Sequence, residues 1–224
     1  MDLKVRDIDQ QLIEFNFEKN FRHNDFFVSK SNKHIFNLLN SWPNWEKNFL
    51  NISGEKFSGK SHLIDIFLKK FKGIKLDATI LNNESLKKIK THQNVVLENL
   101  TTKVDENLIY SLLNIIDQDN KYILITTIDP IVYLKFDLVD LNSRLKNFLL
   151  MNIEKPDDEL IFALILKNLS DRQISLEKKL VNYIIKRIDR SYGKIFDFIY
   201  KIDQLSLIKK KSIDLKIINE VLGE

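Results

Sequence analysis

The sequence predicts an α/β domain with a parallel sheet flanked by helices, followed by a small all-helical domain. Three observations predict this organisation. Buried-strand patterns such as NVVLENL and KYILITTIDP alternate with helical patterns, which is typical of a doubly wound sheet. A glycine-containing loop, residues 54–61, separates an apolar run from an amphipathic one. After about Asn152, every apolar pattern has helical spacing.

The elements of the α/β domain follow from local patterns. Residues 1–20 lack helical periodicity, and we expect an extended arm. The segment KSNKHIFNLLNSW predicts a helix with Ser31 or Asn32 as its cap. Strand, helix, strand, helix and strand are then expected over residues 48–53, 60–71, 94–100, 105–117 and 121–130.

The end of the chain predicts helices only. Pro156 and Asp157 begin the first of them, and Ser175 is expected to cap the second. Two further helical patterns, GKIFDFIYKIDQL and IDLKIINEVL, follow, and IKKKS between them is expected to be a solvated turn. The predicted organisation is an arm, an α/β domain and a helical lid over residues 1–20, 21–152 and 153–224.

Composition narrows the class of protein. The chain has 224 residues, no cysteine and a net charge of +4. Disulfides and cysteine zinc sites are therefore excluded, and a reducing cytoplasm is the expected compartment. The sequence contains neither a long apolar run nor an apolar leader, so we expect no membrane span and no secretory signal. The mild positive charge permits a weak, indirect DNA contact without requiring one.

The segment GEKFSGKS matches the phosphate-binding pattern G-x-x-x-x-G-K-[ST], in the strand–loop–helix context that the pattern requires. Glycines let such a loop curl around phosphates at a helix N-terminus, while the lysine reaches the β- and γ-phosphates and the serine binds Mg²⁺. The alternative is a chance glycine turn before a helix. The predicted nucleotide-binding residues of this segment are Gly54, Lys56, Phe57, Ser58, Gly59, Lys60, Ser61 and His62.

Polar residues end two of the predicted strands. Glu98 stands where P-loop ATPases carry the acid that binds Mg²⁺, so Ser61 and Glu98 are the expected metal ligands. Asn99 stands in the position of a second acid, and an amide cannot accept a proton at neutral pH. We therefore expect nucleotide binding with weak intrinsic hydrolysis. Thr126 and Thr127 end the next strand, and Thr127 is a candidate to contact the γ-phosphate or the attacking water.

These residues, in this order, resemble the AAA+ replication initiator family and, within it, the DnaA regulatory inactivator (Hda) family. FRHNDFFVSKSNKHIFNLL resembles the segment beside the adenine, where Phe27 is expected. DLNSRLKN resembles the segment with the arginine finger, which gives that role to Arg144, expected in a loop. In DRSYGKIFDF, Gly193 stands where such lids carry the sensor II arginine, and Lys194 follows it.

The resemblance implies a negative regulator of chromosomal replication initiation that carries ADP or ATP with Mg²⁺. With the DNA-loaded sliding clamp of the DNA polymerase, such a regulator stimulates hydrolysis of DnaA-bound ATP through its arginine finger. Its clamp contact is a short N-terminal peptide, for which QLIEFNF offers Gln11, Leu12, Phe15 and Phe17. Because the sequence ends just after the lid pattern, we expect no DNA-reading domain of the DnaA type.

Other interpretations remain open. A remodelling AAA+ ATPase of the helicase-loader kind would turn over ATP on single-stranded DNA, and the pair Glu98–Asn99 argues against it. A small-molecule P-loop kinase would transfer phosphate to an acceptor, and the all-helical end of the chain disfavours it. The QLIEFNF segment can equally be an ordinary strand, and Arg144 an ordinary surface cation. Association of copies of the chain is also possible.

Overall fold

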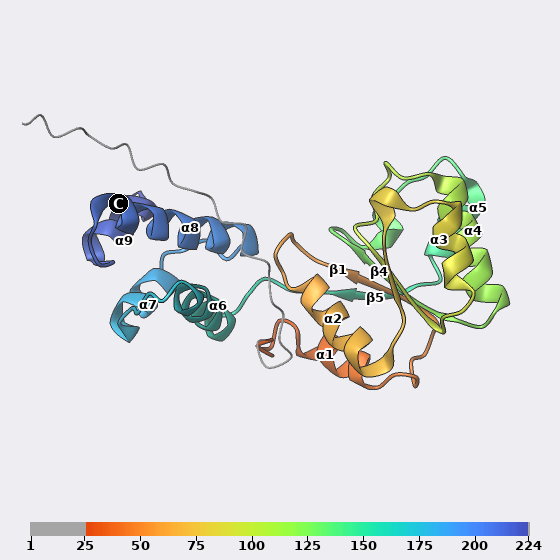
Figure 1. The fold of residues 1–224 in the computed structure, drawn as a ribbon, viewed down its shortest axis with the longest axis horizontal. Helices are drawn as coiled ribbons and strands as arrows, with labels where there is room; N and C mark the ends of the chain where they lie inside the picture. The colour runs from red at the N-terminus through yellow and green to blue at the C-terminus, as the bar shows by residue number, and fades with distance from the viewer. Residues whose placement is uncertain (1–25, 224) are drawn as a thin grey trace, which may run out of the picture.

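The computed structural model describes residues 26–223, which form a layered α/β part and a helical part (Figure 1). In the described chain the α/β part is built on one sheet of five parallel strands in the order β2-β3-β4-β1-β5. From β1 to β5 the strands are Phe49–Ser53, Ile74–Asp77, Asn94–Glu98, Tyr122–Thr127 and Leu149–Asn152. The predicted parallel sheet is confirmed.

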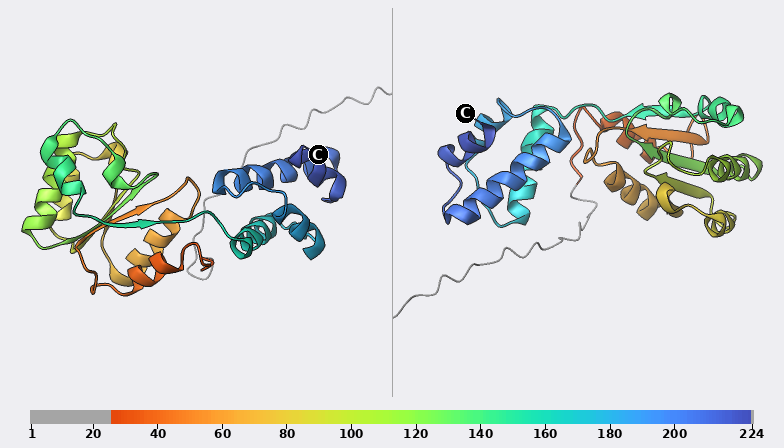
Figure 2. Two further views of the ribbon diagram at one scale, coloured as in Figure 1. Left: turned by 180° about the vertical axis from the view of Figure 1, so that it is seen from behind. Right: turned by 90° about the horizontal axis from the view of Figure 1, so that it is seen from above.

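Helices cover both faces of the sheet (Figures 1 and 2). One face carries α1 (Lys33–Asn40) and α2 (Lys60–Phe71), whose apolar side chains pack on alternate residues of β1, β3 and β4. The other face is covered by α3 (Asn83–Ile89), α4 (Glu106–Gln118) and α5 (Val139–Leu145). Because side chains alternate along a strand, each central strand contributes to both cores. Two short 3₁₀ helices, η2 (Ala78–Ile80) and η3 (Ile131–Tyr133), follow β2 and β4.

The helical part contains α6 (Asp158–Asp171), α7 (Lys178–Ile185), α8 (Tyr192–Lys209) and α9 (Leu215–Leu222), and it has a core of its own. A helix begins after Pro156 and Asp157, as predicted, and Asp157 caps it by accepting a hydrogen bond from the Leu160 backbone N–H at 2.8 Å. Leu160 and Tyr192 pack into the core beneath α2 and thereby join the two parts. Measured against the thickness of a bilayer, each helix of the described chain is too short or too polar to cross it.

The structure differs from the sequence-based prediction at several elements. Strands β2 and β5 and helices α3 and α5 were not predicted. The two strands are edge strands of four residues and the two helices have seven residues each, so all four are too short for a clear pattern. The prediction that Ser175 caps α7 is wrong. The cap is Glu177, because residues 174–177 form neither helix nor strand and Ile174 and Leu176 pack on the helical core.

Candidate nucleotide-binding site

The loop of residues 54–61 leaves β1 at the carboxyl edge of the sheet and leads into α2. Gly59 has φ +91°, a left-handed conformation that side chains resist, and it is the N-cap residue of α2. A Cβ atom on Gly54 would lie 3.0 Å from Ser58 Oγ and 3.1 Å from Ile153 Cβ, so space also requires glycine there. Since Gly59 has no side chain to cap α2, the first N–H groups of this helix face the loop as anion donors.

Lys60 lies inside the loop. Its ammonium donates to the Gly54 carbonyl at 2.6 Å, to the Glu55 carbonyl at 2.7 Å and to Ser58 Oγ at 3.4 Å. Desolvation lowers the pKa of Lys60, although the charges of Glu98 and Glu55 oppose the shift. Phosphate oxygens near Lys60 would stabilise its charged form, because their negative charge offsets the loss of solvation on burial.

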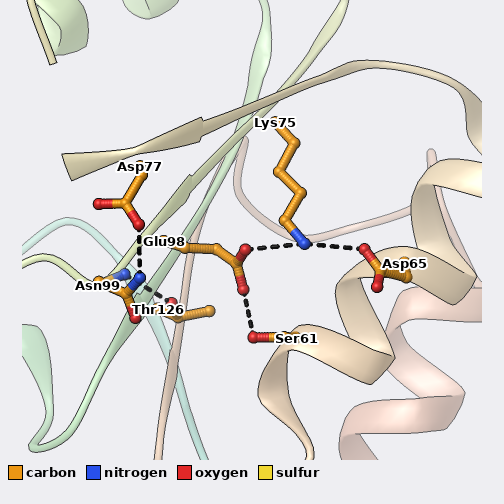
Figure 3. Close-up of polar contacts among 7 residues, drawn as sticks. All are labelled: Ser61, Asp65, Lys75, Asp77, Glu98, Asn99 and Thr126. Atoms are coloured by element: carbon orange, nitrogen blue, oxygen red, sulfur yellow. Dashed lines mark hydrogen bonds and ion pairs between the residues drawn. The ribbon is translucent and has the colours of Figure 1, made fainter. Parts of the chain in front are cut away.

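Ser61 and Glu98, the two expected metal ligands, are in direct contact (Figure 3). Ser61 Oγ donates to Glu98 Oε1 at 2.6 Å, across from the end of β3. The second oxygen, Glu98 Oε2, lies 2.8 Å from Lys75 Nζ, and Lys75 also pairs with Asp65 on α2 at 2.8 Å. Lys75 belongs to the unpredicted strand β2, so the sequence patterns did not indicate that a cation reaches Glu98.

Asn99 follows Glu98 and adopts a left-handed backbone with φ +61°. Its N–H donates to Thr126 Oγ1 at 3.2 Å, and its amide nitrogen donates to Asp77 Oδ2 at 2.8 Å. Burial raises the pKa of Asp77, but hydrogen bonds from Thr79 and Asn99 outweigh it, so the pKa lies below the usual value. The side chain in the second acid position is thus an amide donor held by a charged carboxylate.

Thr127, the sensor I candidate, ends β4 and is buried. Its Oγ1 accepts a hydrogen bond at 3.0 Å from the amide of Asn51, a buried residue of the neighbouring strand β1. The Asn51 carbonyl oxygen of the side chain accepts from the Ile131 N–H at 2.9 Å. Asn51 therefore fixes both the end of β4 and the start of η3, immediately beside the loop.

Two loop side chains contact the helical part. The Glu55 carboxylate accepts hydrogen bonds from the Tyr192 N–H at 2.9 Å and from Ser191 Oγ at 3.0 Å. This carboxylate occupies the N-terminus of α8, where negative charge is stabilising. Phe57 packs on Phe196 of α8 with ring centroids 5.0 Å apart. The loop and α8 are therefore joined at two points.

The residues expected around the base and lid are more dispersed. Phe26 meets His62 edge to face, with centroids 5.2 Å apart, and lies beside Gly59, while Phe27 is 44% exposed. Phe26 rather than Phe27 thus packs on the buried His62 at the start of α2. Lys56 and Lys194 are both exposed, the first in the loop and the second in the first turn of α8.

Arg144 lies in the last turn of α5, which corrects the prediction of a loop. It is held against α4, since Nη1 lies 3.5 Å from Asp117 Oδ2 and the guanidinium lies 5.3 Å from the Tyr110 ring centroid. Helix α5 covers the opposite face of the sheet from α2, so the fold does not bring Arg144 to the chain's own loop (Figures 1 and 2).

The four clamp-binding candidates Gln11, Leu12, Phe15 and Phe17 lie outside the described residues.

Within residues 26–223, the loop has the composition and geometry that a nucleotide phosphate requires. Mg²⁺ has a more restricted fit. Ser61 and Glu98 are suitable ligands, yet Lys75 already pairs with one oxygen of Glu98. No group of three or more His, Cys, Asp or Glu side chains gathers anywhere in that range.

Comparison with solved structures identifies the fold. Domain III of the replication initiation protein DnaA from Thermotoga maritima superposes with a TM-score of 0.71 at 18% identity, over 92% of this chain and 97% of that domain. The chain has the AAA+ fold of DnaA domain III. The AMPPCP-bound DnaA from Aquifex aeolicus gives a TM-score of 0.65 at 18% identity, over 87% of this chain and 67% of that one. A RuvB structure from Thermotoga maritima gives 0.65 at 14%, covering 89% and 70%.

Sequence comparison agrees with this AAA+ fold. The chromosomal replication initiator protein DnaA of Borreliella afzelii is 22% identical over 233 aligned positions, which cover 92% of this chain and 48% of the relative. The chain therefore spans about half the length of this curated relative. No protein-family model matches the sequence. The AAA+ fold and the similarity to DnaA agree with the predicted resemblance to the AAA+ domain of replication initiators.

Several site residues were not predicted from the sequence: Asn51, Glu55, Lys75, Asp77 and Tyr192. Asn51 had a readable signal, because an amide inside an apolar strand must find buried partners. Lys75 and Asp77 had none, since they depend on the pairing of an edge strand with β3. Glu55 and Tyr192 meet only after folding, because they are separated by 137 positions in the sequence.

Proposed function

We propose that this chain is a nucleotide-binding AAA+ protein of the cytoplasm that negatively regulates chromosomal replication initiation. In this proposal it carries ADP or ATP in the loop 54–61 and stimulates hydrolysis of ATP bound to a DnaA partner, with the DNA-loaded sliding clamp. The similarity to DnaA supports the replication context. The observation that carries the proposal is that Arg144 lies across the sheet from the chain's own loop.

Arg144 is suited to act in trans. Its side chain is one-third exposed, and its contacts to Asp117 and Tyr110 hold a charged guanidinium at the surface of α4 and α5. A planar guanidinium in that position can bind phosphate oxygens of a second subunit by paired hydrogen bonds. Asp117 is 62% exposed, so releasing Arg144 from it costs little.

The chain's own loop supports binding rather than turnover. Lys60 and the N-terminal N–H groups of α2 would hold the phosphates. Asn99 donates its amide to Asp77 and cannot accept a proton from water. An arginine finger supplied to a competent partner, by contrast, is worth roughly 10³–10⁵ in rate.

The test is ATP hydrolysis by DnaA of the same organism, with clamp loaded on DNA, in the presence and absence of this protein. Wild-type protein should stimulate hydrolysis, and Arg144→Ala should lose at least about 100-fold of the stimulation. Lys146→Ala, at an exposed position two residues further along the chain, is the matched control and should retain it. A triple alanine variant at Gln11, Leu12 and Phe15 tests the clamp contact separately.

The same assay distinguishes the main alternative. An AAA+ ATPase that remodels a DNA complex would hydrolyse ATP by itself and faster on single-stranded DNA. Turnover by this protein alone, without stimulation of DnaA, would overturn the regulator proposal. The arrangement of Asn99 and Asp77 argues against that result.

A further inference from the structure

Lys75 brings a positive charge to the acidic strand end of the site. Its ammonium lies 2.8 Å from Glu98 Oε2 and 2.8 Å from Asp65 Oδ1, and Figure 3 shows it between the two carboxylates. Strand β2 pairs with β3, the strand that ends at Glu98, and in this pairing Lys75 lies beside Val96. The Lys75 ammonium is therefore positioned by a strand of the sheet and not by a loop.

The two oxygens of Glu98 are both used by protein donors. Ser61 Oγ donates to Oε1 at 2.6 Å, and Lys75 pairs with Oε2. The Glu98 side chain is 10% exposed, and a carboxylate buried to that extent requires a charged partner. Burial lowers the pKa of Lys75, but the hydrogen bonds that Lys75 donates to Asp65 and Glu98 outweigh it and raise the pKa above its usual value. The ammonium is accordingly charged at neutral pH.

We propose that Lys75 supplies the positive charge that a divalent cation supplies beside the acidic strand end of other P-loop proteins, so that nucleotide binds here with little dependence on Mg²⁺. This inference rests on the proposed nucleotide binding. A Mg²⁺ ion shared by Ser61 and Glu98 would have to replace two protein donors on Glu98 and lie near an ammonium of like charge. The ligand would be a nucleoside di- or triphosphate taken up without its metal.

The alternative role for Lys75 is a structural brace between β2 and α2, because it also pairs with Asp65 on α2. A brace and a charge donor predict different results. Removing a brace lowers stability and leaves the effect of Mg²⁺ on binding unchanged. Removing a charge donor frees Glu98 for a metal and makes binding depend on it. Asp65→Asn is the matched control, because it weakens the brace by removing the Asp65 charge and leaves the contact to Glu98.

The experiment is a fluorescence titration of the full chain with N-methylanthraniloyl-ADP, in excess MgCl₂ and in EDTA. For wild type, the two dissociation constants should agree within about threefold, and Lys75→Met should bind at least about tenfold more weakly in EDTA than in MgCl₂. Asp65→Asn should behave as wild type. Lys75→Gln keeps a hydrogen-bond donor to Glu98 without the charge, and should reproduce the dependence if Lys75→Met folds poorly.

Electron paramagnetic resonance of Mn²⁺ gives a second readout. Addition of ADP-loaded Lys75→Gln should immobilise Mn²⁺, whereas ADP-loaded wild type should leave most of it free. A wild-type affinity that falls tenfold or more in EDTA would overturn the role of Lys75 while leaving nucleotide binding intact. Absence of binding in both buffers would instead overturn the proposed function, and this inference with it.

Discussion

The loop after β1 and the ends of β2 and β3 lie at the same edge of the sheet, but their side chains differ in kind. The loop keeps each residue that phosphate binding requires, with Lys60 held by loop carbonyls and glycines at the two constrained positions. At the strand ends, Lys75 pairs with Glu98, and the next residue, Asn99, carries an amide that donates to Asp77. Under the proposed function, phosphate binding and hydrolysis would therefore depend on different elements of the fold.

The largest effect of a single change should come from the loop. Lys60→Ala removes the ammonium that donates to the Gly54 and Glu55 carbonyls inside the loop. We expect the affinity for ADP to fall by about 100-fold, because a charged phosphate contact is lost. Lys70→Ala, in the last turn of the same helix, should change it by less than about twofold. Fluorescence titration measures both. Equal losses in the two variants would mean that the loop is not the binding site.

The strand ends offer a smaller and more informative change. The double variant Asn99→Asp with Asp77→Asn exchanges an amide and a carboxylate that lie 2.8 Å apart. It keeps their hydrogen bond and restores an acid beside Glu98. ATP turnover by the chain alone should rise at least about tenfold, because a positioned base contributes roughly 10²–10⁴.

The single variants sharpen that result. Asn99→Asp alone leaves two carboxylates in contact, which raises the pKa of one of them and should blunt the gain. Asp77→Asn alone adds no acid and should leave turnover at the wild-type level. If the double variant binds ATP as wild type does but hydrolyses it no faster, something other than the missing acid limits turnover.

The same contrast explains what the sequence could predict. Residues 54–61 act through a contiguous pattern whose geometry is local, so the glycines, Lys60 and Ser61 were predicted from sequence and lie where the pattern implies. Glu98 and Asn99 were found because they end a strongly apolar strand. Lys75 and Asp77 were missed because their meaning depends on the register of a four-residue edge strand, IKLD, which has no readable periodicity. Arg144 was singled out by resemblance alone, and its helix and its contacts to α4 needed the structure.

The loop differs from the strand ends in one more respect, because it is tied to the helical part through Tyr192. The Tyr192 N–H donates to Glu55 and its hydroxyl donates to the Glu154 carbonyl at 3.0 Å, while the side chain is almost fully buried. Tyr192→Phe keeps the first bond and removes the second. We expect it to lower the free energy of unfolding by about 1 kcal/mol near neutral pH, with little effect on nucleotide affinity.

This last variant also has a pH signature. Burial raises the pKa of Tyr192 from 10.0 to about 12, so the folded state favours the protonated phenol. Its contribution is complete below pH 10 and is lost as pH rises toward 12, by about 2–3 kcal/mol in all. The phenylalanine cannot ionise, so the stability gap between wild type and variant should shrink above pH 10 and then reverse. Urea unfolding followed by circular dichroism at several alkaline pH values measures the gap, and a gap that stays constant would show that the phenol is not buried against Glu154 in solution.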